Sequence, residues 1–283
     1  RDLRARMTTR RYKNLVPDSL LHRHLESLLR EHGGRVALRT VCEEVLALPA
    51  NDPALAGTLV ESLIEEDARL RLTDSVVELV EPDREQVWQA CRRFAVVDVE
   101  AANGNGPARI IEVGVCLVED GRPVREWSSL VNPGRPIPFW IRQLTGITNQ
   151  TVRTAPPFQE LLPRLLEDLE DAILVGHHAR FDVGCLNDEV SRLLGKRLSN
   201  FYLCTAELAR RFLPGSDNYR LQTLSQWLRL THERPHRAGS DARATAELFC
   251  RLLETDGIAW GDFLRPRSPV ADKKTETNPP VLS

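Results

Sequence analysis

Apolar and polar positions alternate along this chain in two rhythms, and the change between them falls near residue 94. Over residues 18–82, apolar residues mostly recur three or four positions apart, which predicts three amphipathic helices. The last of these is predicted to begin at Pro53, with Asn51 or Asp52 as its N-cap. The segment ends in two short alternating runs around a Thr-Asp-Ser turn, which is typical of a β-hairpin.

After this change, apolar runs of strand length alternate with helical stretches. One such stretch, residues 156–170, places its leucines on a single stripe and predicts a helix packed on a sheet. The order of elements predicts an α/β domain with a mixed five-stranded sheet flanked by helices. The predicted strands cover residues 94–100, 108–120, 123–133, 172–178 and 200–205.

The three helices and terminal hairpin resemble a winged-helix domain, which often binds DNA through its third helix. Here the third helix argues against this, because it carries Glu61, Glu65, Glu66 and Asp67 without a single Lys or Arg. A small packing or protein-contact module is the preferred interpretation of this domain, with a replication or repair protein as the candidate partner. The predicted organisation is a basic flexible arm (1–17), the winged-helix-like domain (18–82), a connecting helix or linker (83–92), the α/β domain (93–256) and a mostly disordered tail (257–283).

Composition adds limits but names no partner. A net charge of −2, with 42% hydrophobic and 28% charged residues, is typical of a soluble globular chain, and a polyanion would need a local patch or metal ions to bind. The six cysteines show no CxxC pair and are predicted to be reduced thiols. No apolar run approaches the roughly 20 residues of a membrane span, so a cytoplasmic location without a membrane partner is expected. Met7 is the only methionine, so the natural start lies there or the chain begins mid-sequence.

Acidic residues follow several predicted elements of the α/β domain. Asp98 and Glu100 stand two apart in the first strand, so both side chains point to one face, where they repel unless a cation lies between them. Asp182 begins one helix and Asp241 begins another, five residues after His236. Helix capping explains either of these two acids singly. It does not explain why three segments of one domain end in acids.

The order D-x-E, H-x-A-x-F-D and H-R-A-x-x-D-A-R-A-T resembles the DEDDh exonucleases, a DnaQ-like family that includes the proofreading subunit of bacterial replicative polymerase. The resemblance covers residues 92–255, with LTGIT at 144–148 in the expected place. It implies an RNase H-like fold and a metal-dependent release of nucleoside 5′-monophosphates from a 3′ end, with two Mg²⁺ or Mn²⁺ ions in each site. The residues implied are Asp98, Glu100 and Asp241 for one ion, Asp98 and Asp182 for the other, and His236 as general base.

The resemblance also implies contacts to the terminal nucleotide, and here the chain departs from the family. Ala101-Ala102-Asn103-Gly104 replaces the usual Thr-Thr-Gly, His178 replaces an Asn, and Cys204 replaces an Asp. For His178, packing or hydrogen bonding is favoured over catalysis, and Trp140 is the preferred stacking residue. The implied substrate contacts are Ala101, Ala102, Trp140, Leu144, Thr145 and His177.

The leading hypothesis is therefore a 3′ to 5′ exonuclease that acts on single-stranded or frayed DNA 3′ ends in repair or proofreading. An RNA-trimming exoribonuclease stays open, because the metal site does not discriminate the 2′-hydroxyl. A non-catalytic nucleic-acid-binding adaptor is the alternative from another class.

Overall fold

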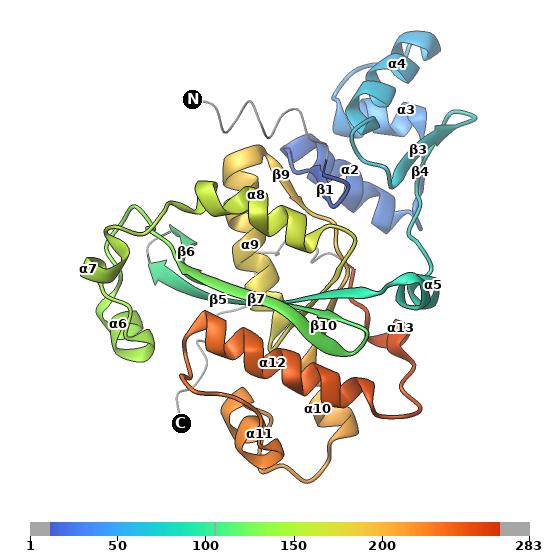
Figure 1. Cartoon of the computed structure of the whole chain (residues 1–283). Coiled ribbons are helices and arrows are strands. Elements are labelled where there is room, and N and C mark those ends of the chain that lie inside the picture. Colours follow the sequence, from blue (N-terminus) through green and yellow to red (C-terminus); the bar gives the residue numbers. More distant parts are fainter. Residues whose placement is uncertain (1–11, 105, 267–283) are drawn as a thin grey trace.

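The α/β domain is built on a mixed sheet of five strands in the order β10-β8-β5-β6-β7. The computed structural model describes residues 12–104 and 106–266 (Figure 1). β5 is antiparallel to β6 and parallel to β8, which is itself parallel to β10. This confirms the predicted five-stranded mixed sheet. Its strands are β5 (Arg93–Gly104), β6 (Gly106–Glu119), β7 (Arg122–Leu130), β8 (Ile173–Gly176) and β10 (Tyr202–Cys204).

Alternation along β5 divides the domain into two hydrophobic layers. Ala95, Val97 and Val99 face one layer, whereas Phe94 and Val96 face the other, as expected for a strand buried on both sides. The first layer is covered by α8 (Phe158–Leu169) and α9 (Ala179–Leu194). The second is covered by α10 (Thr205–Phe212), α11 (Leu221–Leu228), α12 (Ala238–Leu253) and α13 (Trp260–Phe263). A smaller hydrophobic cluster packs α6 (Phe139–Thr145) against the C-terminal end of β5 and the N-terminal half of β6. The short helix α7 (Asn149–Val152) follows α6 in the chain.

The N-terminal domain has its own hydrophobic core beneath a three-stranded sheet of order β2-β4-β3. Asp52 caps its third helix by accepting hydrogen bonds from two backbone N–H groups, with Pro53 at the first turn, as predicted. The winged-helix resemblance itself stays a prediction. The elements are α2 (Leu20–Glu31), β2 (Arg35–Ala37), α3 (Leu38–Thr40), a π-helical turn (Val41–Val45), α4 (Pro53–Ile64), β3 (Leu70–Thr73) and β4 (Val76–Leu79).

The two domains are joined by a strand pair that the sequence did not reveal. β1 (Leu15–Pro17) is buried and pairs antiparallel with β9 (Lys196–Leu198), directly after α9. The prediction that residues 1–17 form a flexible arm is therefore wrong at its last three residues, because Leu15 and Val16 enter the core. Residues 1–11 of that arm lie outside the described part of the chain.

Residues on either side of the α/β domain are packed as well. The predicted connecting helix or linker, 83–92, contains the helix α5 (Arg84–Ala90), whose Trp88 stacks on Trp260 at 4.6 Å between ring centroids. The predicted tail begins too early, because α13 and the fully buried Leu264 belong to the core, while residues 267–283 lie outside the description. Among the described helices, we find none with the length and apolar character to cross a membrane.

Candidate active site

Three parallel strands end at one edge of the sheet, and this edge carries the acids. β5 and β8 pair only as far as Val96 and Val175, so beyond these residues the two strands separate. Diverging parallel strands leave a crevice at their carboxyl ends, where α/β proteins place ligands. The continuation of β5 past Val96 therefore forms the floor of a site.

Asp98 and Glu100 project from this floor toward the layer that contains α12. They share the face of Phe94 and Val96 by the two-residue period of the strand. The pairing of β5 with β6 then shifts register between Glu100 and Ala101, as in a β-bulge. Bulges bend a strand and redirect its side chains, and they are common beside active sites.

Asp182 enters the crevice from the first turn of α9. Its carboxylate is buried and accepts a hydrogen bond of 3.0 Å from the backbone N–H of Val99, on the β5 edge that β8 has left. Gly176, the last residue of β8, permits this approach, because a Cβ there would lie 3.2 Å from Oδ2 of Asp182. The open strand edge thus fixes the acid in place.

Asp241 comes from the first turn of α12, on the opposite side of the sheet. The start of α12 approaches β6 so closely that a Cβ on Gly114 would collide with the carbonyl oxygen of Ala238. Gly114 is the β6 partner of Asp98, so this contact brings Asp241 over the acids of β5. Glu112, the partner of Glu100, anchors the same turn by accepting a 3.0 Å hydrogen bond from the Ala238 N–H.

Two histidines of the loop before α12 converge on Asp241. His232 Nε2 lies 2.7 Å from Oδ1 of Asp241, and the ring is almost fully buried. The backbone N–H of His236 donates to Oδ2 at 3.1 Å, and His236 adopts a left-handed conformation with φ of 62°. One ring nitrogen of His236 and one oxygen each of Glu100 and Asp241 lie within 4.8 Å of one another. The structure therefore brings the four acids and His236 together.

Crowding changes the protonation of all four acids. Burial, reinforced by repulsion from Asp182, Asp241 and Glu100, raises the pKa of Asp98 well above its usual range. Burial and the charges of Asp241 and Glu112 raise the pKa of Glu100 to about 8. Burial likewise raises the pKa of Asp182 and of Asp241. The cluster is thus unfavourable as four bare carboxylates.

The donor set fits a hard divalent cation. Carboxylate oxygens are the ligands that Mg²⁺ and Mn²⁺ prefer, and a cation among these acids would offset the repulsion that raises their pKa values. Asp98, Glu100, Asp182 and Asp241 are the residues that would hold it. Hydrogen bonds to Val99 and to the histidine loop already orient two of the carboxylates.

The predicted substrate contacts divide into exposed and internal groups. Trp140 and Leu144 are exposed on α6, at 54% and 45%. The Thr145 hydroxyl is instead buried between the Ile141 carbonyl and the Ile147 N–H, and the methyl groups of Ala101 and Ala102 lie in the core.

The His177 ring is also internal, and its predicted contact with the substrate stays a prediction. It is buried, with Nδ1 at 2.9 Å from the Thr205 hydroxyl and Nε2 at 2.9 Å from the Tyr219 carbonyl oxygen. Both ring nitrogens are therefore engaged within the protein. The ring holds the edge of the sheet together and has no nitrogen left for a substrate.

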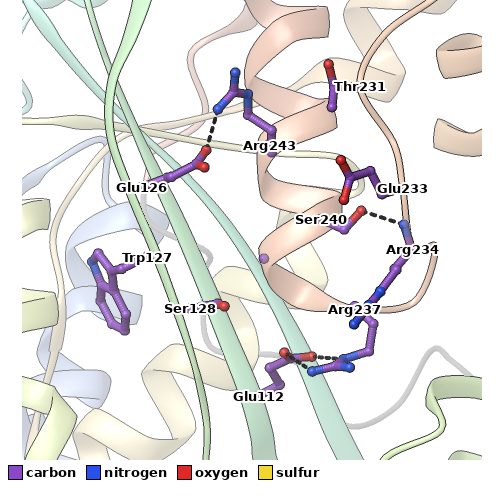
Figure 2. A pocket seen from close by; sticks show the side chains of 11 residues that line it. Glu112, Glu126, Trp127, Ser128, Thr231, Glu233, Arg234, Arg237, Ser240 and Arg243 are labelled. Atoms are coloured by element: carbon purple, nitrogen blue, oxygen red, sulfur yellow. Dashed lines mark hydrogen bonds and ion pairs between the residues drawn. The ribbon is translucent and has the colours of Figure 1, made fainter.

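Sequence reasoning missed the supports around the loop that bears His236. His232 precedes His236 by four residues in a polar stretch, and this second histidine was the only available signal. The buried Glu112 forms a bidentate pair with Arg237, with Nε–Oε2 and Nη2–Oε1 distances of 2.9 and 2.8 Å (Figure 2). Both residues line a groove of about 670 Å³ behind the loop, together with Glu126, Trp127, Ser128, Thr231, Glu233, Arg234, Gly239, Ser240 and Arg243.

The acidic crevice at the carboxyl edge of the five-stranded mixed sheet has the donor set of a divalent-cation site. The Exonuclease (RNase T) family model matches residues 95–249, which include all four acids and His236. The chain belongs to this exonuclease family, whose fold implies a divalent metal cofactor.

Named relatives agree with this membership. The chain is 37% identical over 166 residues to the 3′-5′ exonuclease DinG of Bacillus subtilis, covering 58% of this chain and 18% of that protein. It is 37% identical over 169 residues to the DNA polymerase III subunit epsilon of Aquifex aeolicus, covering 59% of this chain and 84% of the subunit. It thus spans less than a fifth of DinG but most of the epsilon subunit.

The fold is also that of a solved structure, the nuclease domain of 3′hExo, a DEDDh family member bound to rAMP. The similarity covers 64% of this chain and 98% of that domain, with a TM-score of 0.51 and 20% identity. The RNase H-like exonuclease fold expected from the sequence is thereby confirmed.

Proposed function

We propose that this chain is a 3′ to 5′ exonuclease that releases nucleoside 5′-monophosphates from single-stranded or frayed DNA 3′ ends. The observation that carries the proposal is the convergence of four carboxylates from β5, α9 and α12 on one crevice, each with a raised pKa. Four ionised carboxylates at such close range are unfavourable without a cation. Divalent cations would neutralise them and would also bind a phosphodiester. Membership of the exonuclease family supplies the reaction class.

Each residue of the site has a separate proposed role. Two bound Mg²⁺ or Mn²⁺ ions would supply charge neutralisation for the attacking and leaving oxygens of an in-line displacement. Asp98 would bridge toward Glu100 and Asp241 on one side and toward Asp182 on the other. His236, exposed on its loop beside Glu100 and Asp241, would accept the proton of the attacking water. His232 would keep Asp241 oriented toward the crevice.

DNA is the proposed substrate because one of the relatives described above is a subunit of a DNA polymerase and the other is a 3′-5′ exonuclease. A role in repair or proofreading goes with this substrate. RNA trimming is the alternative outcome of the same assay. We further propose that the N-terminal domain contacts a replication or repair protein, because α4 and the residues after it expose Glu61, Glu65 and Glu66, which disfavour a phosphate backbone.

The test is a cleavage assay on a 5′-labelled oligonucleotide with Mg²⁺, in matched DNA and RNA sequences. A ladder that shortens stepwise from the 3′ end, stops in EDTA and disappears in Asp98→Ala is the expected result. Preference for the RNA strand would replace the DNA assignment. Absence of cleavage of both strands, or full activity in Asp98→Ala, would refute the exonuclease proposal.

A further inference from the structure

The carboxyl edge of the sheet extends beyond the acids, over the ends of β8 and β10. The buried ring of His177 joins this part, because it bonds to Thr205 at the start of α10 and to Tyr219 in the loop before α11. His232, which contacts Asp241, lies close enough for its charge to act on His177. His177 therefore links the part of the edge beside Asp241 to the start of α10.

His178 stands on this surface one helical turn before Asp182. It is the N-cap residue of α9, has a left-handed φ of 71°, and is exposed. Its ring meets the edge of the His177 ring at 5.1 Å between centroids and 82° between planes. Partial burial lowers the pKa of His178, and the charge of Arg210 lowers it further, which favours the neutral ring. A neutral ring in this place can stack on a base or share one hydrogen bond.

Arg210 supplies a positive charge beside this ring. It is exposed on α10, and its guanidinium carbon lies 5.6 Å from the centroid of the Tyr219 ring. An aromatic ring below a guanidinium favours a fixed position while the N–H groups stay available to a phosphate. The sheet edge is thus acidic over β5 and cationic and aromatic over β8 and β10.

The order of the strands places α6 and Arg210 on opposite sides of the acids. α6, with the exposed Trp140 and Leu144, packs at the β5–β6 end of the site, whereas Arg210 lies on the opposite side, past β8. If the 3′-terminal nucleotide lies at α6 and the cut bond lies over the acids, the rest of the strand would continue toward α10.

We propose that His178, Arg210 and Tyr219 form a subsite for the nucleic acid strand on the 5′ side of the bond that is cut. Arg210 binds a phosphodiester of that strand, and the rings of His178 and Tyr219 contact an unstacked base. This subsite rests on the proposed exonuclease function. It provides binding contacts to the strand in addition to the contacts to the terminal nucleotide.

The test compares substrates with and without a 5′ strand. With Mg²⁺, Arg210→Ala should raise KM for an eight-nucleotide oligo-dT about tenfold, and much less for the p-nitrophenyl ester of thymidine 5′-monophosphate. Arg210→Lys should recover part of the loss. The control is Arg211→Ala, which removes the neighbouring exposed arginine of the same helix and should match the wild type on both substrates.

Equilibrium binding separates this subsite from the reaction. Fluorescence anisotropy of labelled oligo-dT in EDTA should show a salt slope smaller by about 0.7 in Arg210→Ala, the value expected for one lost phosphate contact on a single strand. Equal slopes and equal KM ratios for Arg210→Ala and Arg211→Ala would overturn the subsite. So would absence of binding by the wild type. The exonuclease proposal would fail separately, through a wild type that cleaves neither substrate.

Discussion

Among the buried charged side chains of residues 12–104 and 106–266, two clusters have opposite character. The first joins the two domains: Arg197 on β9 lies 3.0 Å from Asp18 and 2.8 Å from Glu26. Arg23 and Arg69 add further cations to the same cluster. The second is the acidic crevice of the candidate site, where four carboxylates meet beside His232 and His236.

The protonation of the acids follows this difference. Burial raises the pKa of Asp18, but hydrogen bonds from Arg23 and Ser191 and the charge of Arg197 outweigh it, and the net pKa is lowered. In the crevice, burial and like charges act together and raise the pKa values. A buried acid with matched cations therefore stabilises the fold, whereas an acid without them is a place for a ligand.

The largest effect that tests this contrast is the loss of activity in Asp98→Asn. Removing one ligand of the proposed metal site should lower the cleavage rate by at least about a thousandfold. The same change removes a repelling charge, so the metal-free protein should melt a few degrees higher at pH 8. Nuclease assays and thermal melts in EDTA measure both. Asp188→Asn, an exposed acid on the same α9 helix, is the control and should change neither. A lower melting temperature of metal-free Asp98→Asn would contradict the proposed difference between the acidic crevice and the inter-domain cluster.

The inter-domain cluster should respond in the reverse way. Arg197→Ala leaves Asp18 and Glu26 buried without their shared cation and should lower the free energy of unfolding by about 3 to 5 kcal/mol. Urea unfolding at pH 7 measures this. Arg251→Ala, which removes an exposed arginine paired with the exposed Glu254, should lower it by less than about 1 kcal/mol. Similar values for the two variants would show that the buried pairs contribute no more than surface pairs.

Backbone packing near the crevice supplies a third test. Gly114→Ala places a methyl group against the Ala238 carbonyl, so α12 must shift and Asp241 moves relative to Asp98. We expect the cleavage rate to fall about tenfold to a hundredfold, because small misplacement of catalytic groups has effects of this size. Gly184→Ala on α9, where an added Cβ meets nothing within 4 Å, is the control and should keep full activity. Equal activity in the two variants would show that α12 has room to adjust.

The sequence predicted the crevice better than it predicted the inter-domain cluster. Asp98 and Glu100 share one face at the end of a strongly apolar strand, and Asp182 and Asp241 begin helices. The resemblance to the DEDDh motifs then grouped these four acids into one predicted site. The cluster of Arg197 with Asp18 and Glu26 joins residues 171 or more positions apart, through a strand pair of three residues on each side. Pairs of such short strands carry little local signal, so residues 15–17 were predicted as part of a flexible arm.

The sequence could not predict the side-chain contacts of His177 and Thr145, for a related reason. Both belong to segments typical of the exonuclease family, yet their polar atoms are bonded to Thr205, Tyr219, Ile141 and Ile147. A motif names a residue type at a position but does not say whether its polar atoms face inward. That depends on packing between segments, which the sequence pattern does not record.

The smallest expected effect, and the one that links protons to metal, is the pH dependence of stability. The folded-state pKa of Glu100 is about 8, against an ordinary value of 4.5, so protonation of this group stabilises the folded state. That contribution is complete below pH 4.5 and is lost as the pH rises through 8, so the metal-free protein should melt a few degrees lower at pH 8.5 than at pH 6. Mg²⁺ competes with these protons and should raise the melting temperature more at pH 8.5 than at pH 6. Thermal melts in EDTA and in Mg²⁺ at both pH values measure the difference, and in Glu100→Gln both dependences should weaken. A Mg²⁺ effect that is equal at the two pH values would show that the cation does not bind among the protonated acids.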